Sequence, residues 1–258
     1  MLLHARGLAE SRARAQALIL AGLAFSGDRR IAKPGDLLPA DAALTVKGRD
    51  HPWVSRGGVK LAHALARFGW SDLTGLSVLD IGASTGGFTD VALAHGAARV
   101  FAVDVGYGQL AARLRTDPRV TVLERTNARY LTREQLAAAP EFIVCDASFI
   151  SLRAVLPAAL ALAAPGARLV ALIKPQFEAG PAEAPKGVVR DPAVHARVCA
   201  EVAHWLATQP GWSVAGLVDS PLIGPQGNRE FLLAGVHTPV GHPPAGATGA
   251  RSAPRNPV

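Results

Sequence analysis

Four charged residues in this 258-residue sequence have the types needed to remove a proton from a weak acid. They are two lysines and two acids, Lys60, Asp146, Lys174 and Glu230. A lysine that is crowded by a second lysine and partly removed from water gives up its proton more easily and can then act as a general base. We therefore take Lys174 as the candidate base, Asp146 as the group that orients it, and Glu230 as the partner that balances or positions Lys60.

The elements that must position these residues alternate between strands and helices from Leu76 onward. Short apolar runs predict strands in "SVLDIGA", "RVFAVDV", "VTVLER", "EFIVCDA" and "RLVALIK", with a closing pair in "WSVAGLVDSPL" and "REFLLAGVH". The spans between them predict helices at 88–95, 109–115, 133–138, 152–164 and 192–207. Apolar strands that alternate with helices indicate an α/β, doubly wound, Rossmann-like domain, with a mostly parallel sheet covered on both faces.

Ligands of an open α/β sheet bind beyond the carboxyl ends of its strands. Asp146 and Lys174 end the fourth and fifth expected strands, so both should face the same crevice. Taken singly, each charged residue has an ordinary alternative as a solvated surface group, and the "RGGVK" stretch before Lys60 could be a plain turn. Two lysines and two acids around one crevice together favour proton abstraction from a poor acid.

The stretch "VLDIGASTGGFTD" lies where the first strand of this domain meets its first helix. Gly82, Gly86 and Gly87 let the backbone pass close to a ligand, although their spacing is not the G-x-G-x-x-G of dinucleotide folds. Asp104 ends the second strand, where a carboxylate can accept hydrogen bonds from two ribose hydroxyls. These features indicate a ribose-bearing cofactor, NAD or S-adenosylmethionine. Asp80 favours the second, because it can hold the turn or reach the cationic methionine part.

The basic excess lies in the N-terminal part of the chain. The formal net charge is +7; residues 1–58 carry nine lysines and arginines against five acids, and residues 59–237 carry sixteen against fifteen. A small basic module beside a near-neutral domain favours a polyanionic partner, RNA or DNA. Residues 1–48 predict a small α+β unit, with a helix from Ser11 to about Ala21 and short strands in "LAFS" and "ALTV".

Residues 49–54 are interpreted as a linker, 55–237 as the larger domain, and the Pro-, Gly- and Ala-rich stretch 238–258 as a disordered tail. The sequence has no apolar run long enough for a membrane span and no signal-peptide pattern at its start. Cys145 and Cys199 have apolar neighbours and no metal-ligand spacing. They predict buried thiols in a reducing, cytoplasmic setting, and no metal site.

Seven stretches of the sequence resemble a known family. "GLAESRARAQALILAG…KPG" is similar to an S4-type RNA-binding domain. "VSRGGVKL", "DIGASTGGFT", "AVDVGYGQL", "CDASFISL", "LIKPQFEAG" and "KGVVRDP", in this order, resemble the TlyA family, with the likeness covering roughly residues 6–237. That family consists of bacterial S-adenosylmethionine-dependent 2′-O-methyltransferases of ribosomal RNA cytidines, also labelled hemolysins, whose catalytic domain is similar to FtsJ/RrmJ.

The resemblance implies a class I methyltransferase fold, with a seven-stranded, mostly parallel sheet whose last strand is antiparallel. It carries the Lys-Asp-Lys-Glu tetrad of FtsJ-type enzymes onto Lys60, Asp146, Lys174 and Glu230. It also implies S-adenosylmethionine as cofactor and ribosomal RNA or ribosomal subunits as partners, without stable membrane association or a stated oligomeric state. Family members usually begin with a longer first S4 helix of the type "RLDxxLxxxGLAxSR", so we expect either that the start codon is assigned too late or that the first helix is truncated here.

The same resemblance yields two sets of candidate contacts. The expected cofactor contacts are Asp80, Gly82, Ser84, Gly86, Gly87, Phe88, Asp104, Asn127 and Asp146. The expected RNA contacts are Arg12, Arg14, Arg29, Arg30 and Lys33 in the N-terminal unit, and Arg56 and Lys186 nearer the active site. Phe149 is expected to stack on the cofactor or on a base, or to belong to the core.

Two other functions compete with the methyltransferase interpretation. One is an S4-type RNA-binding protein whose larger domain binds cofactor without catalysis, against which the intact tetrad argues. The other is a membrane-lytic protein, as the hemolysin label suggests. The sequence shows no membrane span and no long basic amphipathic helix with aromatic anchors to support it.

Overall fold

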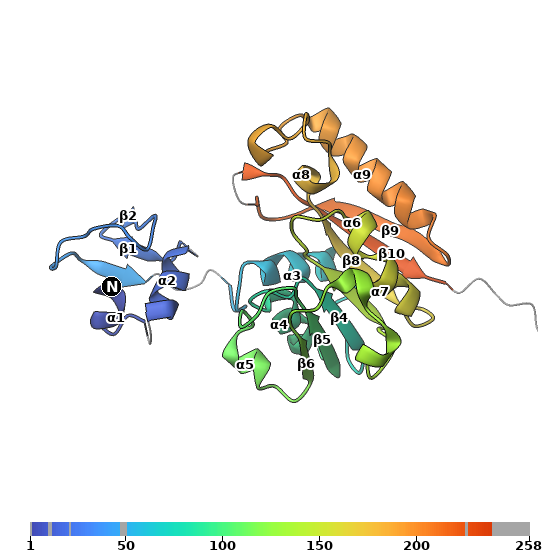
Figure 1. Cartoon of the computed structure of the whole chain (residues 1–258), viewed down its shortest axis with the longest axis horizontal. Coiled ribbons are helices and arrows are strands. Elements are labelled where there is room, and N and C mark those ends of the chain that lie inside the picture. The colour runs from blue at the N-terminus through green and yellow to red at the C-terminus, as the bar shows by residue number, and fades with distance from the viewer. Residues whose placement is uncertain (1, 10–11, 21, 47–50, 225–226, 239–258) are drawn as a thin grey trace, which may run out of the picture. The chain divides into compact units, whose positions relative to one another are not determined.

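The computed structural model describes residues 2–9, 12–20, 22–46, 51–224 and 227–238 (Figure 1). The chain forms two compact units, Met1–Pro52 and Trp53–Val258, so the larger unit begins slightly before the boundary expected at residue 55. The expected helix cap at Ser11, part of the 49–54 linker and the 239–258 stretch of the tail lie outside the described residues.

The N-terminal unit combines two helices with a small antiparallel sheet. Its elements are α1 (Leu2–Ala5), α2 (Arg12–Leu20), β1 (Ala24–Ser26), β2 (Arg29–Arg30) and β3 (Leu44–Val46), and the strand order is β2-β1-β3. The "GDRR" turn continues into β2, which pairs with β1 as a hairpin. Ala15 and Leu18 of α2 pack with Ala24 and Leu44 of the sheet in one apolar cluster.

The larger unit contains a seven-stranded sheet in the order β6-β5-β4-β7-β8-β10-β9. Its strands are β4 (Ser77–Ile81), β5 (Arg99–Val103), β6 (Val120–Leu123), β7 (Phe142–Cys145), β8 (Arg168–Ile173), β9 (Trp212–Asp219) and β10 (Phe231–His237). Strands β4 to β8 pair in parallel, whereas the last strand, β10, lies between β8 and β9 and is antiparallel to both. The predicted fold class is confirmed.

Helices cover both faces of this sheet because successive strand residues point to opposite sides. Leu79 and Phe101 pack on one face with α6, α7 and α9, while Val78 and Val100 pack on the other with α3, α4 and α5. The helices are α3 (Gly57–Phe68), α4 (Gly87–Ala94), α5 (Ala112–Arg115), α6 (Leu152–Val155), α7 (Pro157–Leu162), α8 (Pro175–Glu178) and α9 (Pro192–Ala207). Helix α9, orange in Figure 1, packs along β9.

Three expected helices differ in length from the prediction. The 109–115 span is helical only in α5, and the 133–138 span forms the 3-10 turn η2 (Arg133–Gln135). Such short spans form too few hydrogen bonds to offset the cost of helix nucleation. The 152–164 span divides into α6 and α7 at Pro157, which has no backbone N–H to continue the first helix. Both cysteines are free and buried as expected, and burial raises the pKa of each thiol to about 12.

Candidate active site

Lys60 is placed by the first turn of α3, which packs tightly against the residues just before it. A side chain at Gly58 would come within 2.4 Å of the Trp53 ring, so this position requires glycine. The neighbouring backbone is held as well, because the Val54 N–H donates to Asp90 Oδ2 of α4 at 2.7 Å. The Gly-Gly pair therefore allows the entering segment to lie against α3, which fixes the direction of the Lys60 side chain.

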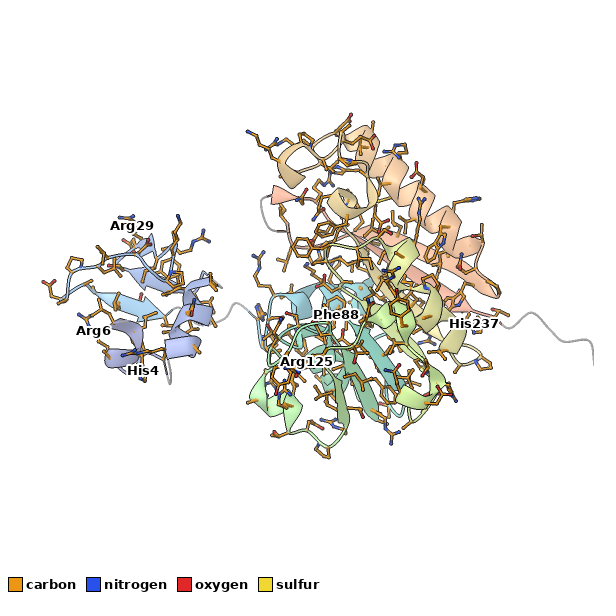
Figure 2. The ribbon with its side chains drawn as sticks, viewed as in Figure 1. His4, Arg6, Arg29, Phe88, Arg125 and His237 are labelled. Atoms are coloured by element: carbon orange, nitrogen blue, oxygen red, sulfur yellow. The ribbon has the colours of Figure 1, made fainter. Side chains whose placement is uncertain are left out.

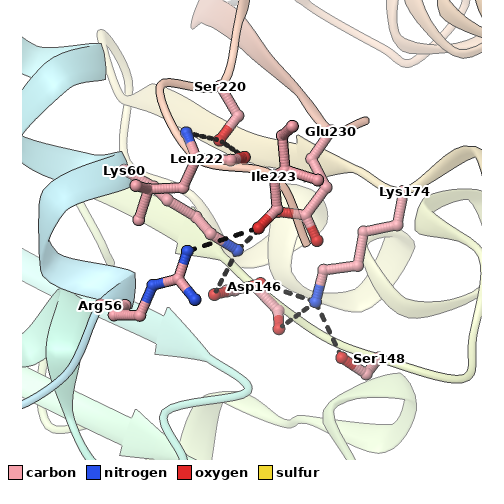
Figure 3. A network of polar contacts seen from close by, with 9 residues as sticks. All are labelled: Arg56, Lys60, Asp146, Ser148, Lys174, Ser220, Leu222, Ile223 and Glu230. Atoms are coloured by element: carbon pink, nitrogen blue, oxygen red, sulfur yellow. Dashed lines mark hydrogen bonds and ion pairs between the residues drawn. The ribbon is translucent and has the colours of Figure 1, made fainter. Parts of the chain in front are cut away.

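The four side chains singled out from the sequence meet in one cluster (Figure 3). Lys60 Nζ lies 2.6 Å from Glu230 Oε2 and 3.9 Å from Asp146 Oδ2. Lys174 Nζ lies 2.7 Å from Asp146 Oδ1. Asp146 is thus shared between the two lysines, and the cluster balances two positive with two negative charges.

Sheet topology explains why these residues converge. Asp146 follows β7 and Lys174 follows β8, so both lie at the carboxyl edge of the parallel strands. Glu230 reaches the same edge from the other direction, because it precedes β10 and Phe231 at the start of that strand pairs with Ile173 at the end of β8. Because β8 and β10 run in opposite directions, the end of β8 and the start of β10 place Lys174 and Glu230 at the same edge of the sheet.

The cluster is buried unevenly. The side chain of Glu230 is 1% exposed and those of Lys60 and Lys174 are 11% and 8% exposed, whereas Asp146 is 21% exposed. A buried charge is tolerated only when partners replace its hydration, which each lysine here obtains from a carboxylate. Asp146 is the member of the cluster most open to the neighbouring cleft.

Lys174 makes two further polar contacts. Its Nζ donates to the backbone oxygen of Asp146 at 3.1 Å and to Ser148 Oγ at 2.8 Å. Together with Asp146 Oδ1, these acceptors use all three hydrogens of an ammonium group. Sequence reasoning missed Ser148, since a serine two residues after a strand-end acid carries no signal of its own.

A cleft of about 370 Å³ opens beside the cluster. Its lining includes Gly82, Asp104, Asn127 and Asp146 among the expected cofactor contacts, together with Ser148 and Phe149. This volume lies within the range of about 300–1,000 Å³ that is typical of small-molecule sites. The turn below it needs glycine at Gly82, which has a φ of 80° and whose Cβ would come within 2.9 Å of the Ala147 backbone.

Asp104 is fixed in a position suited to holding vicinal hydroxyls. Its two oxygens accept from the backbone N–H groups of Ser84 at 2.8 Å and Gly106 at 2.7 Å, which orients the carboxylate at the end of β5. Each carboxylate oxygen keeps a free lone pair in this arrangement. Asn127 Oδ1 accepts from the Arg129 N–H at 3.1 Å and so caps the 3-10 turn η1 (Ala128–Tyr130) at the cleft wall. These residues fit a ribose-bearing cofactor.

Asp80 lies behind the glycine turn and is fully buried. Thr89 Oγ1 donates to its Oδ2 at 2.6 Å, which ties the end of β4 to α4. Burial raises the pKa of Asp80 to about 7, with smaller contributions from the negative charges of Asp146 and Asp104. Of the two roles expected for this carboxyl, the hydrogen bond supports the one that holds the turn.

Four other expected cofactor residues do not line the cleft. Ser84 contributes its backbone N–H to Asp104. A side chain at Gly86 would clash with Leu114, and one at Gly87 would lie 2.2 Å from Ser55 Oγ, so both glycines permit close packing of α4. Phe88 is 3% exposed and belongs to the apolar core (Figure 2).

Phe149 lies on the loop after β7 and is 90% exposed, so the alternative of a core role is wrong. Its φ of 65° falls in the left-handed region, where a bulky residue is strained. The centroid of the Phe149 ring lies 5.1 Å from that of the Phe177 ring, and Phe149 forms part of the cleft lining. An exposed, strained aromatic beside a cluster of charges is typical of a ligand-binding position.

The expected RNA contacts are exposed wherever their side chains are described. Arg12, Arg29, Arg30 and Lys33 are exposed in the N-terminal unit, and Figure 2 labels Arg29 among them. The side chain of Arg14 is not among those that the structure describes. Arg56 is exposed beside the cluster and donates to the Ile223 backbone oxygen at 3.5 Å (Figure 3). Lys186 is exposed as well and has a φ of 55°.

The described residues contain neither a helix suited to crossing a membrane nor a cluster of metal-ligating side chains. In the part of the chain that the structure describes, no helix is long and apolar enough to cross a membrane. The same part of the chain contains no group of three or more His, Cys, Asp or Glu side chains that could hold a metal ion.

Comparison with known proteins agrees with the geometry. Residues 53–236 match the FtsJ-like methyltransferase family. The 16S/23S rRNA (cytidine-2′-O)-methyltransferase TlyA of Mycobacterium tuberculosis is 50% identical over 230 residues, which cover 88% of this chain and 85% of the relative. Hemolysin A of Brachyspira hyodysenteriae is 38% identical over 232 residues, which cover 89% and 95%.

A solved structure from Streptococcus thermophilus, described with the word hemolysin, has 42% identity and a TM-score of 0.74, and the match covers 92% of this chain and 86% of that one. The family match includes the whole charged cluster and the cleft beside it. The resemblance drawn from the sequence motifs is therefore confirmed: the chain belongs to the TlyA family of FtsJ-like methyltransferases.

Proposed function

We propose that this protein transfers a methyl group from S-adenosylmethionine to the ribose 2′-hydroxyl of a cytidine in 16S and/or 23S ribosomal RNA, in the cytoplasm. The observation that carries the proposal is the position of Asp146, which is shared between two buried lysines at the edge of a cleft suited to a ribose-bearing cofactor. The relatives named as rRNA (cytidine-2′-O)-methyltransferases support the substrate.

The cleft would hold the cofactor through groups that are already oriented. Asp104 would accept hydrogen bonds from the ribose hydroxyls, and the backbone at Gly82 would lie close to the amino-acid part. Asn127 would contact the adenine. Bound there, S-adenosylmethionine would supply an electrophilic methyl group on a positively charged sulfur.

The charged cluster would prepare the attacking oxygen. A ribose hydroxyl is a weak acid, so it needs a base and a stabilising positive charge as it attacks. Lys174 would take the proton, and Asp146 would hold Lys174 in place through the 2.7 Å contact. Lys60, fixed by Glu230 at 2.6 Å, would stabilise the negative charge that develops on the oxygen. Holding hydroxyl and methyl in line would supply much of the acceleration.

The exposed basic residues would hold the RNA. Arg12, Arg14, Arg29, Arg30 and Lys33 would contact phosphates from the N-terminal unit, and Arg56 and Lys186 would do so near the cluster. Contacts of this kind release counterions, so RNA affinity should fall steeply with salt. Phe149 would stack on the target base, which an exposed aromatic can do without breaking its own packing.

Incubation of ribosomal subunits with tritiated S-adenosylmethionine tests this function. Wild-type protein should label the RNA of at least one subunit, and Lys174→Ala should not. Arg119→Gln, which alters an exposed cation paired with Asp117, is the matched control and should label normally. No labelling of any ribosomal RNA by the wild type would refute the enzyme interpretation and would favour an RNA-binding protein without catalysis.

The hemolysin name of some relatives calls for a second measurement. Liposome leakage at micromolar concentrations of the same preparations tests for lytic activity directly. Wild-type protein is expected to leave the liposomes intact, because the charged cluster is buried and is not available for contact with a membrane. Leakage that Lys174→Ala leaves unchanged would support a lytic activity separate from methyl transfer.

A further inference from the structure

Lys174 Nζ is the donor in all of its hydrogen bonds, so the nitrogen has no lone pair available to accept a proton. Its Nζ faces three acceptors, Asp146 Oδ1 at 2.7 Å, the Asp146 backbone oxygen at 3.1 Å and Ser148 Oγ at 2.8 Å. An ammonium group has three donors and no acceptor, so this arrangement describes protonated Lys174. Before Lys174 can take a proton from a substrate, one of its three hydrogens must leave along one of these contacts.

Only one of the three contacts gives a ready path for a proton. The Asp146 backbone oxygen has no proton to pass on. Asp146 Oδ1 could accept the proton only by losing its charge, which would end its ion pair with Lys174 and its longer contact, 3.9 Å, with Lys60. Ser148 Oγ accepts and donates at once, so a proton can pass through it while the serine keeps its neutral form.

Ser148 also lies where such a path must run. The Lys174 side chain is 8% exposed, so it has little direct access to the cleft. Figure 3 shows Ser148 in contact with Lys174. Ser148 is exposed and belongs to the cleft lining, next to Phe149 in the chain. Its hydroxyl therefore connects Lys174 Nζ to the cofactor cleft, at whose edge the substrate ribose would have to meet the methyl group.

We propose that Ser148 passes the proton between the ribose hydroxyl and Lys174, an inference that rests on the methyl transfer proposed above. As the new O–CH₃ bond forms and the S–CH₃ bond breaks, the 2′-hydroxyl proton moves to Ser148 Oγ. The proton of Ser148 moves at the same time to the neutral amine of Lys174. Ser148 ends unchanged, and Lys174 ends as the ammonium with three acceptors. Passage of one proton back through Ser148 to a water molecule resets the amine.

Three variants separate this role from a structural one. Ser148→Ala removes the hydroxyl, Ser148→Thr keeps it, and Ser151→Ala is the matched control. Ser151 lies on the same loop at the start of α6 and makes no side-chain hydrogen bond to that helix. The single-turnover rate of methyl transfer to ribosomal RNA is measured for each. The affinity for S-adenosylhomocysteine by calorimetry and the unfolding temperature complete the comparison.

Ser148→Ala should lower the single-turnover rate by about tenfold or more, while Ser148→Thr and Ser151→Ala stay within about threefold of the wild type. The affinity for S-adenosylhomocysteine and the unfolding temperature should not change. The single-turnover rate in mixtures of H₂O and D₂O reports the number of protons in flight, because two protons move together in the proposed step. The wild-type rate should vary with the deuterium fraction along a curve, and that of Ser148→Ala along a straight line.

The outcomes distinguish this inference from the function on which it rests. A wild-type protein that transfers no methyl group refutes the proposed function, and the inference with it. An active wild type with Ser148→Ala equally fast refutes the inference alone. Equal losses in Ser148→Ala and Ser148→Thr, or a loss that weaker binding of S-adenosylhomocysteine explains, would likewise overturn it and leave the function standing.

Discussion

Lys60 Nζ lies 2.6 Å from Glu230 Oε2, and the Glu230 side chain is 1% exposed. The pair therefore has a structural as well as a chemical role. Removing one partner of a buried ion pair leaves the other charged and without hydration, which typically costs about 3–5 kcal/mol. Lys60→Ala should lower the free energy of unfolding by an amount of this order, in addition to abolishing methyl transfer.

A double variant separates the two effects of Lys60. Lys60→Met with Glu230→Gln removes both charges together and should recover most of the lost stability, while methyl transfer stays absent. Urea unfolding measures the stability, and tritium transfer to ribosomal RNA measures the activity. A single Lys60→Ala variant as stable as the wild type would show that the pair does not form in solution.

Phe149→Ala should weaken the interaction with RNA and leave that with the cofactor unchanged. Stacking of a base on an aromatic side chain is worth about 1–3 kcal/mol, so the KM for RNA should rise roughly tenfold. Tyr130→Ala is a suitable control, because Tyr130 is also exposed but does not line the cleft. A selective loss of affinity for S-adenosylhomocysteine in Phe149→Ala would place the ring on the cofactor instead.

Arg29 and Arg30 are exposed on β2 and should contribute to RNA affinity through phosphate contacts. Replacing both by Gln should reduce the slope of log affinity against log salt concentration by about 1.5. A control that replaces Arg119 and Arg197 removes the same charge from side chains already paired with acids. Equal slopes for the two double variants would mean that net charge, and not this strand, determines RNA binding.

Asp80 should make stability depend on pH. Burial raises its pKa to about 7 from an ordinary value of 3.8, so between these values the folded protein keeps a proton that the unfolded chain releases. Stability should therefore decrease as pH rises through this window and level off above it. Asp80→Asn can still accept from Thr89 without ionising.

Urea unfolding at about pH 5 and about pH 8 measures the effect of Asp80. The Asn variant should gain stability relative to the wild type as the pH rises. Asp72→Asn is the control, since hydrogen bonds donated by Thr74 lower the pKa of that exposed acid and keep it ionised throughout. Parallel pH profiles of wild type and Asp80→Asn would contradict the prediction.

The alternation of strands and helices was enough to predict the sheet and half of the site. Asp146 and Lys174 end neighbouring parallel strands, and a general rule places such residues at one edge. No such rule covers Lys60, which precedes the first strand of the sheet, or Glu230, which opens an antiparallel strand. Their place in the cluster was inferred from the residue types of the four taken together, and the family resemblance supported it.

The remaining differences concern burial and side-chain direction, which a single sequence does not encode locally. Phe88 and Phe149 each follow a turn at a strand end, yet the first lies in the core and the second is 90% exposed. Gly86 and Gly87 were expected at the cofactor, but the packing around α4 already requires them. Ser148 could not be singled out, because its role depends on where the Lys174 ammonium points.

Identification of the methylated nucleoside is the direct test of ribose 2′-O-methylation by this protein. Ribosomal RNA labelled by the wild type is digested to nucleosides and analysed by mass spectrometry, with Lys174→Arg in parallel. Arginine keeps the positive charge but gives up no proton near neutral pH, so it cannot act as a base. We expect 2′-O-methylcytidine from the wild type and none from Lys174→Arg. A methyl group on a base, or an unchanged yield from Lys174→Arg, would contradict this expectation.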